Sequence, residues 1–355
     1  MVRVGVIGAG MIAQREHIPG YQKCGNAEVV AVADPLEDRV KEVACCFNIP
    51  NAYTEWRKVV QRKDVDAVSV CTPNATHAEI SIAAAKAGKH VLVEKPMATS
   101  MAEVDAMIAA AEKAGVHLMV EQTVRFYPES EAAKDILESG ILGKIQTVRG
   151  RVSHGGPEYW SPTGKWFLQK KHAFGGTMCD LAIHGIDLIR WLVGEPIVEV
   201  AGFQGLLEKK GTDVEDNGVF IYKFASGAMG TMESSWTTRP EDTCVHLYCQ
   251  NGNIKLTLWQ EEETVVTQPM VVEVECPAGA FVPSLPKESR RGGPFAYFVH
   301  CIETGEKPFV SGEEGGASLE VILAAYESAR TGKVVRLPLP RKRAEAAPAR
   351  GKKRR

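Results

Sequence analysis

Short apolar segments alternate with helical segments from residue 2 to residue 120 of this 355-residue chain. We predict strands at 2–8, 28–34, 65–71, 90–94 and 116–120, with helices at 11–23, 36–47, 76–88 and 100–114. The strands are apolar at nearly every position, which is typical of strands that are covered on both faces. The alternation therefore predicts an α/β fold with a doubly wound parallel sheet. Pro19 should end or bend the first helix.

The first strand runs directly into the loop Gly8-Ala9-Gly10-Met11-Ile12-Ala13, which opens the first helix. This G-x-G-x-x-A pattern, in a strand–turn–helix context, is typical of dinucleotide sites. Gly8 permits the tight turn, and Gly10 lets a pyrophosphate approach the backbone. Met11 and Ile12 begin the helix whose free N–H groups would hold the phosphates. We therefore predict that this loop binds a dinucleotide.

Asp34 ends the second strand, about 20 residues after the loop, where a carboxylate binds the ribose 2′-hydroxyl. A carboxylate there repels a 2′-phosphate, and Pro35 and Leu36 follow it rather than a phosphate-binding Arg or Ser. The pattern favours NAD over NADP. Arg39 keeps NADP as the alternative, because it lies one turn into the next helix and could swing inward.

The pattern changes after residue 124. We predict helices at 129–139, 177–193, 294–304 and 314–330, and strands at 145–153, 197–205, 217–224, 228–236, 243–249, 253–258 and 263–275. Alternating strands of this kind indicate an α+β domain with a large, mostly antiparallel open sheet. We divide the chain into a dinucleotide-binding Rossmann domain (1–123), a substrate-binding and oligomerisation domain (124–340) and a tail (341–355).

The tail reads RKRAEAAPARGKKRR, and its basic, Ala- and Pro-rich composition predicts disorder. We interpret it as a solvated appendage, with contact to nucleic acid as the less favoured alternative. No apolar run approaches the roughly 20 residues that span a bilayer, and the N-terminus lacks the pattern of a secretory signal, so we expect a cytoplasmic protein. Nine cysteines without a C-x-x-C pair favour buried thiols and predict no metal site.

Two clusters of residues could carry chemistry. Lys95 follows Glu94 at the carboxyl end of the fourth predicted strand, which is the edge where ligands bind in such sheets. Asp180 and His184 are four residues apart on a predicted helix and should share one face. The plain alternatives are a surface lysine and a buried structural histidine. Next to a dinucleotide site, the functional interpretation is favoured.

Oxidation of an alcohol needs a base for the hydroxyl proton and a donor or cation that favours an alkoxide-like transition state. His184 fits the base, and Lys95 fits the electrostatic partner or proton relay. Asp180 would orient His184 or a substrate hydroxyl. The pattern requires no metal.

The chain resembles the glucose–fructose oxidoreductase/inositol dehydrogenase (Gfo/Idh/MocA) family. The resemblance rests on GAGMIA at 8–13, AVADP at 31–35, TPNATHAEISIAAAKAGKHVLVEKP at 72–96, RFYP at 125–128, GGTMCDLAIHGIDLIRWLVG at 175–194 and ASLEVILAAYESARTGKVVRLP at 317–338. It implies a Rossmann domain followed by an α/β domain whose open sheet forms the contact of a homo-oligomer, a dimer or tetramer. It also implies that Lys95 is catalytic, together with Asp180 and His184, and that the Lys95–Pro96 bond is often cis.

By the same resemblance, further residues line the cofactor or substrate. On the cofactor side we assign Thr72, Pro73, Asn74, His77, Glu94, Lys95, Gln122 and Trp166, and on the substrate side Lys95, Arg125, His154, Trp166, Asp180 and His184. The sequence departs from the family at Glu121-Gln122-Thr123, where relatives often carry Gly-Phe-Asn. The resemblance implies that this strip borders the substrate, so the substrate cannot be copied from the relatives. The segment 151–166 is expected to form a second wall of the substrate site.

The resulting hypothesis is an NAD-dependent dehydrogenase that acts on a ring hydroxyl of a sugar, cyclitol or glycoside. Two alternatives stay open. One is an enzyme that cleaves glycosides through transient oxidation by tightly held NAD. The other is a non-catalytic sensor that binds the dinucleotide and a partner, which the presence of both Lys95 and His184 disfavours.

Overall fold

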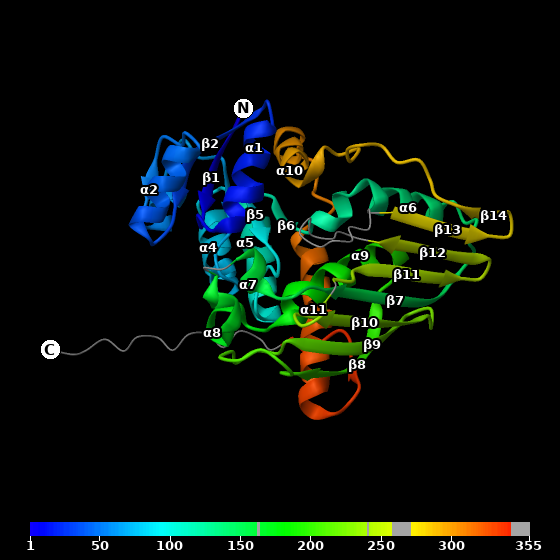
Figure 1. Cartoon of the computed structure of the whole chain (residues 1–355). Coiled ribbons are helices and arrows are strands. Elements are labelled where there is room, and N and C mark those ends of the chain that lie inside the picture. The colour runs from blue at the N-terminus through cyan, green and yellow to red at the C-terminus, as the bar shows by residue number, and fades with distance from the viewer. Residues whose placement is uncertain (162–163, 240, 258–270, 342–355) are drawn as a thin grey trace.

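The computed structural model describes residues 1–161, 164–239, 241–257 and 271–341, and it contains two sheets (Figure 1). The first sheet has six parallel strands in the order β3-β2-β1-β4-β5-β6. These are β1 (Val2–Ile7), β2 (Ala27–Ala33), β3 (Ala52–Tyr53), β4 (Ala67–Val70), β5 (His90–Glu94) and β6 (Leu118–Glu121). The order reverses at β1, as in doubly wound dinucleotide-binding sheets, and this confirms the predicted fold class.

The helices of this first sheet are α1 (Ile18–Lys23), α2 (Glu37–Cys46), α3 (Trp56–Val60), α4 (His77–Lys86) and α5 (Met101–Ala114). Pro19 does not end the first helix, which continues to Lys23. The preceding turn, Ala13–His17, is instead a π-helix, and Pro19 occupies the first turn of α1, where a missing N–H is tolerated. The short elements β3 and α3 were not predicted.

Within the described residues the second sheet has nine strands, in the order β14-β13-β12-β11-β7-β10-β9-β8-β15. They are β7 (Ile145–Ser153), β8 (Ile197–Gly205), β9 (Asn217–Phe224), β10 (Met229–Ser235), β11 (Cys244–Cys249), β12 (Gly252–Thr257), β13 (Val271–Cys276), β14 (Gly279–Phe281) and β15 (Val335–Arg336). All pairs are antiparallel except β7 with β10. The predicted large, mostly antiparallel sheet is therefore present. Most of the predicted strand at 263–275 and the tail beyond 341 lie outside the described residues.

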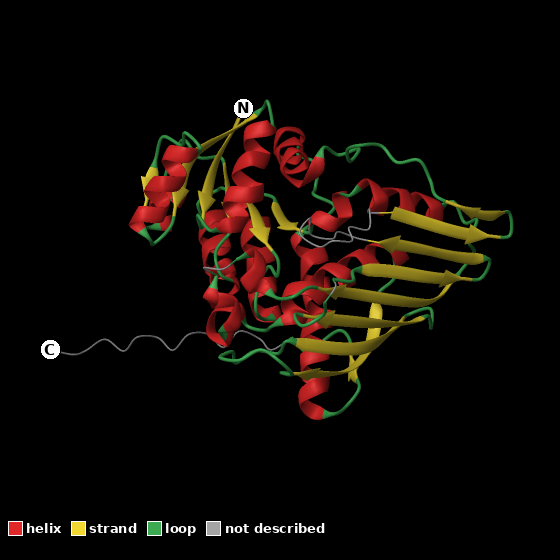
Figure 2. Cartoon of the chain, viewed as in Figure 1, coloured by secondary structure: helices red, strands yellow, loops and turns green. Residues whose placement is uncertain are grey.

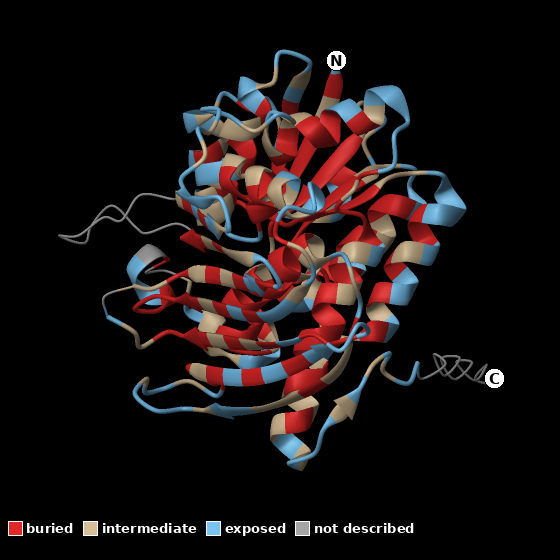
Figure 3. Ribbon diagram, turned by 90° about the vertical axis from the view of Figure 1, so that its right-hand side faces the viewer, coloured by how far each residue is buried: buried red, intermediate tan, exposed pale blue. Residues whose placement is uncertain are grey.

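Helices cover one face of the second sheet, and none of the described helices covers the other face, which we call the bare face (Figures 1 and 2). The helices of this half are α6 (Pro128–Glu138), α7 (Pro157–Trp160), α8 (Lys170–Ala173), α9 (Ile183–Val193), α10 (Gly293–Thr304) and α11 (Gly312–Thr331). Helix α9 packs on β7, and α11 packs on β8. Buried and exposed residues alternate along these strands, so that only one face contributes to the core (Figure 3).

Helix α10 returns to the first sheet although it follows the second sheet in sequence. Phe295 packs against Tyr21 and His17, with ring centroids 5.2 Å and 4.9 Å apart. A side chain at Gly20 would collide with the Phe295 ring, so glycine allows this close approach. Helix α11 contacts α5 and β6 as well as β8 and α9. The two halves of the chain are thus joined by shared helices. None of the described helices is long and apolar enough to cross a membrane.

Candidate active site

Two adjoining cavities lie at the carboxyl edge of the first sheet, where β5 ends. The larger, of about 220 Å³, is lined by Met11, Ile12, Arg15, Glu16, Glu94, Lys95, Glu121, Thr123, His154, Asp180, Leu181 and His184. The smaller, of about 100 Å³, is lined by Gly10, Met11, Ile12, Cys71, Thr72, Asn74, His77, Glu94, Lys95, Ser161, Trp166, Phe167 and Asp180. Lys95 and Asp180 belong to both walls and therefore stand where the two cavities meet.

Lys95 and Asp180 form an ion pair between the two halves of the molecule. The Lys95 ammonium donates to the Asp180 carboxylate and to the Asp180 backbone carbonyl, each at 3.0 Å. Their side chains are 16% and 7% exposed, so the pair is nearly dry but still reaches the cavity. The Lys95–Pro96 peptide bond is cis.

Each member of this pair stabilises the charged form of the other. Burial alone would lower the pKa of Lys95, but the charges of Asp180 and Glu94 outweigh burial and raise it above its usual value. Burial alone would raise the pKa of Asp180, but Lys95 and the neighbouring histidines hold it below its usual value. The resting site therefore contains an ammonium and a carboxylate near neutral pH.

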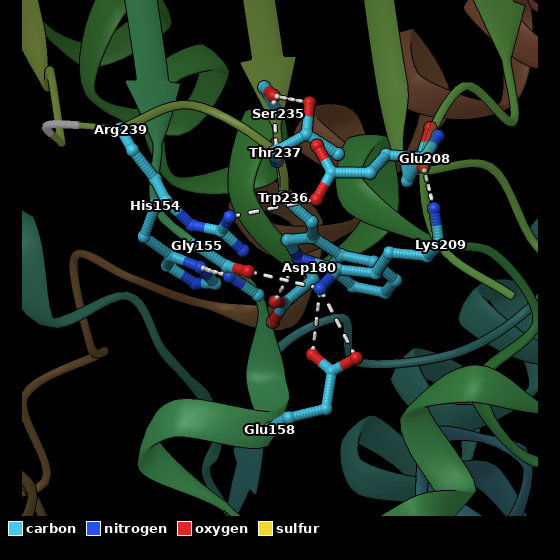
Figure 4. A network of polar contacts seen from close by, with 12 residues as sticks. His154, Gly155, Glu158, Asp180, Glu208, Lys209, Ser235, Trp236, Thr237 and Arg239 are labelled. Carbon is cyan, nitrogen blue, oxygen red and sulfur yellow. Dashed lines mark hydrogen bonds and ion pairs between the residues drawn. The ribbon is translucent and has the colours of Figure 1, made fainter.

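Trp236, directly after β10, fixes the second oxygen of Asp180. Its indole N–H donates to Asp180 Oδ2 at 3.2 Å, and the ring is fully buried. Figure 4 shows Trp236 beside Asp180. In the same network Lys209 donates to Gly155 O and to both carboxylate oxygens of Glu158, at 3.0–3.1 Å. These bonds of Lys209 hold the segment 154–158 in place, and this segment positions His154 in the wall of the larger cavity.

His184 lines the larger cavity one turn beyond Asp180. Burial and the positive charge of Lys95 lower the pKa of His184 well below its usual value, although Asp180 acts in the opposite direction. Burial likewise lowers the pKa of His154, which accepts a hydrogen bond from Gly156 N at 2.8 Å. Both imidazoles are therefore neutral near pH 7. A neutral imidazole can accept a proton in this cavity.

The local fold explains the position of Asp180. Residues Met178–Ala182 form a π-helix that leads into α9, and the buried Glu215 carboxylate accepts the N–H groups of Gly176 and Met178 at its start. A side chain at Gly176 would collide with Glu215 O, so glycine is needed for this approach. The wider π turn and its carboxylate cap set the direction in which Asp180 projects.

The glycine loop forms a cradle that fits a dinucleotide. Gly8 has a φ of +95°, and a Cβ there would lie 2.5 Å from Cys71 O. A Cβ at Gly10 would meet nothing within 4 Å, so the backbone borders open space, as a pyrophosphate requires. Asp34 is buried at the end of β2 and accepts Ala9 N at 3.0 Å, which places its carboxylate against the loop. Arg39 lies 3.4 Å from the same carboxylate.

The other residues predicted for the cofactor fall into two groups. Thr72, Asn74, His77, Glu94 and Trp166 line the smaller cavity beside the glycine loop. Pro73 precedes the short 3₁₀ turn Asn74–Thr76, and Gln122 is buried; neither belongs to the wall of either cavity. Trp166, also predicted for the substrate, lies on the smaller cavity only and stacks on Phe167. Within the described ranges no group of His, Cys, Asp or Glu could hold a metal ion.

Arg125 is placed away from both cavities. Its guanidinium donates to both oxygens of Asp187 at 2.6 and 2.7 Å and to Glu314 at 3.0 Å, and its side chain is 1% exposed. The structure thus puts Arg125 inside the protein, where it joins the segment after β6 to α9 and α11. The motif that suggested a substrate contact at Arg125 coincides with a buried structural ion pair.

The sequence assigned no role to several residues that line the cavities, among them Arg15, Glu16 and Leu181 in the larger cavity and Cys71, Ser161 and Phe167 in the smaller one. Glu121 belongs to the strip where the sequence departs from the family; it ends β6 and lies in the wall of the larger cavity, at the sheet edge where ligands bind. No spacing in the sequence connects Trp236 with Asp180, because the contact depends on how β10 packs beside the π-helix.

Comparisons with known proteins agree with this architecture. Residues 2–122 match the oxidoreductase family described as having an NAD-binding Rossmann fold, and residues 130–255 match the GFO/IDH/MocA C-terminal domain. Myo-inositol 2-dehydrogenase of Thermotoga maritima is 29% identical over 357 residues, which cover 95% of this chain and 98% of that protein.

Two solved structures are similar over almost their whole length. The aldose-aldose oxidoreductase of Caulobacter crescentus, complexed with glycerol, has a TM-score of 0.84 and 27% identity, covering 95% of this chain and 99% of that chain. Levoglucosan dehydrogenase in complex with NADH and levoglucosan has a TM-score of 0.82 and 26% identity, covering 95% and 100%. With its glycine cradle and both family domains, the chain belongs to the Gfo/Idh/MocA family of NAD-binding oxidoreductases.

Proposed function

We propose that this protein is an NAD-dependent dehydrogenase that oxidises a ring hydroxyl of a sugar, cyclitol or glycoside to a ketone. One observation carries the proposal: the Lys95–Asp180 pair stands where the glycine-loop cavity meets a second cavity that contains His184. A hydroxyl in the second cavity would have an ammonium donor and a neutral imidazole acceptor within the same walls.

The protonation states suggest separate roles for the two residues. His184, neutral near pH 7, takes the hydroxyl proton as the carbinol is oxidised. Lys95, held as an ammonium by Asp180, donates a hydrogen bond to the same oxygen and stabilises its developing negative charge. Asp180 acts through Lys95, because its carboxylate oxygens are occupied by Lys95 and Trp236. Bound NAD+ supplies the hydride acceptor.

The residues at the glycine loop support NAD rather than NADP. Asp34 is buried against Ala9, and a carboxylate there binds a ribose diol but repels a 2′-phosphate. Arg39 already pairs with Asp34, which favours its present position over one that would welcome a phosphate.

A screen of sugars, inositols and glycosides with NAD+ or NADP+, followed by absorbance of the reduced cofactor, tests this function. We expect net NADH formation with at least one polyol and a higher kcat/KM with NAD+. Bond cleavage of a glycoside without net NADH would contradict the proposal and indicate transient oxidation instead. A clear preference for NADP+ would contradict the assignment of Asp34.

We also propose that the bare face of the second sheet joins copies of this chain. Phe203, Val219, Ile221, Met229 and Tyr248 lie on the sheet with 40–80% of their surface exposed. An apolar face of this kind is unusual on a monomer and suits a symmetric contact with a second copy. Light scattering should give a dimer or tetramer for the wild type and a smaller species for Ile221→Arg. A wild-type monomer would contradict this proposal.

A further inference from the structure

Two glutamates lie side by side at the edge of the first sheet. Glu94 ends β5, Glu121 ends β6, and the two residues are direct partners in the register of these parallel strands. Both are more than nine-tenths buried, and both line the larger cavity. Neighbouring carboxylates in a buried site repel each other, so ionising both members of the pair costs free energy.

The surroundings decide which member of the pair is ionised. Glu94 Oε1 is 2.9 Å from His17 Nε2, and Glu94 Oε2 accepts the backbone N–H of Lys95 at 3.1 Å. Burial alone would raise the pKa of Glu94, but His17, Lys95 and His77 hold it below its usual value. Glu94 is therefore the anion of the pair.

Glu121 has far fewer partners. Among the described residues only Thr123 donates to it, through its hydroxyl to Glu121 Oε2, which leaves Oε1 without a donor in that part of the chain. Burial, together with the charges of Glu94 and Glu16, raises the pKa of Glu121 to about 7, although His17 and Thr123 act in the opposite direction. Glu121 is thus a buried acid in the cavity wall, and its charge changes near neutral pH. Its Oε1 can accept a hydrogen bond from a ligand.

The charges around the larger cavity indicate which donor suits Glu121. Four carboxylates line it, and the cations are Arg15 and Lys95, of which Lys95 is paired with Asp180. An ammonium group beside Glu121 would supply the missing donor and offset the repulsion from Glu94. A carboxylate on the substrate would add a further anion, and a hydroxyl would donate without changing the charge.

We infer that Glu121 is a specificity-determining residue that selects an amine-bearing ring, an amino sugar or aminocyclitol, over the same ring bearing a carboxylate. The inference rests on the proposed function for the reaction and adds to it the chemical class of the substrate. The hydroxyl that is oxidised faces Lys95 and His184, and the amine faces Glu121.

The test uses glucose, 6-amino-6-deoxyglucose and glucuronate, which carry a hydroxyl, an ammonium and a carboxylate at the same carbon of one ring. Their inhibition constants are measured against whichever polyol yields NADH, at pH 6 and pH 8. At pH 8 we expect the amino sugar to bind about ten-fold more tightly than glucose, the size of one charge-assisted hydrogen bond, and glucuronate to bind most weakly. At pH 6 a protonated Glu121 should reduce the preference for the amine, since it no longer attracts a cation.

Glu121→Gln should reduce the ratio of amino-sugar binding to glucose binding to about one and remove its pH dependence. Glu28→Gln, which removes an exposed acid that lines neither cavity, is the matched control and should change the ratio less than two-fold. If Glu121→Gln does not fold, Thr123→Val gives a second test. Loss of the Thr123 hydrogen bond should raise the pKa of Glu121 and move the amine preference to higher pH.

An unchanged ratio in Glu121→Gln, or wild-type protein that binds glucuronate more tightly than the amino sugar at pH 8, would overturn the inference. Failure of the dehydrogenase proposal would look different, because no polyol would then yield NADH. In that case calorimetry of the same three probes with NAD+-loaded protein still measures whether Glu121 discriminates between them.

Discussion

Two ion pairs join the first sheet to the segment 178–193, and they differ in what surrounds them. Lys95, after β5, pairs with Asp180, and Arg125, after β6, pairs with Asp187. The first pair is 16% and 7% exposed and borders both cavities, whereas the second is 1% and 2% exposed and borders neither. Asp180 and Asp187 are seven residues apart and both pair with a cation, but only the Asp180 pair borders the cavities.

The difference lies in how the donors are used. Arg125 and Asp187 collect further partners inside the protein, since Glu314 accepts from Arg125 and Ser318 donates to Asp187. A sealed pair of this kind fixes how the elements sit but offers nothing to a ligand. Lys95 keeps an ammonium with three donors at the cavity wall, with two of its bonds going to Asp180. Access to the cavity, more than the ion pair itself, distinguishes a reactive group from a structural one.

The largest effect should come from Lys95→Met. We expect kcat/KM for polyol oxidation to fall about 10³-fold, because the donor to the reacting oxygen is lost. NAD+ affinity, measured by calorimetry, should change little, and His184→Asn should behave similarly. Near-wild-type turnover in either variant would show that the exposed pair is not the reactive one.

Arg125→Met should instead lower the stability of the folded protein. Removing one member of a buried pair leaves Asp187 without its main partner, and we expect a loss of about 3–5 kcal/mol in the free energy of unfolding, measured with urea. Turnover per folded molecule should stay close to the wild type. If stability were unchanged while activity disappeared, the roles assigned to the two pairs would have to be exchanged.

The acid limb of the pH profile provides a third comparison. His184 must be neutral to accept a proton, and burial with the charge of Lys95 lowers its pKa well below the usual value. Oxidation should therefore persist below the pH at which an ordinary histidine becomes protonated, and decline only as pH falls through the lowered pKa. In Lys95→Met, NMR of the imidazole should show His184 titrating at higher pH. An unmoved titration would mean that Lys95 does not act on His184.

Trp236→Phe should have the smallest effect. It removes one hydrogen bond to Asp180 but retains most of the apolar ring, so we expect about a five-fold loss in kcat, the size of one net hydrogen bond of about 1 kcal/mol. KM should change little, because Trp236 is fully buried and acts through Asp180 and Lys95. A change confined to KM would instead indicate that the indole reaches the substrate.

The sequence predicted most of the long strands and helices along the chain, because apolar periodicity and glycine positions are local signals. Strand ends and helix spacing singled out Lys95, Asp180 and His184, the resemblance implied that they act together, and in the structure all three line one cavity. It did not predict that Arg125 is sealed inside the protein, since RFYP reads the same whether the arginine meets a ligand or Asp187. Long-range contacts such as Trp236 with Asp180 leave no local pattern. The π turns at Ala13–His17 and Met178–Ala182 likewise depend on packing that single-sequence periodicity does not report.

The return of α10 to the first sheet has a consequence for synthesis on the ribosome. Phe295 and Phe298 of α10 belong to the same apolar cluster as Val4 and Tyr21, near the start of the chain. The first half that emerges can pair its strands at once, but part of its hydrophobic surface stays open to water until the residues of α10 have left the exit tunnel. The nascent dinucleotide-binding half is therefore a folding intermediate with exposed apolar surface. A ribosome that stalls while it translates the strands of the second sheet would leave this surface open to chaperones.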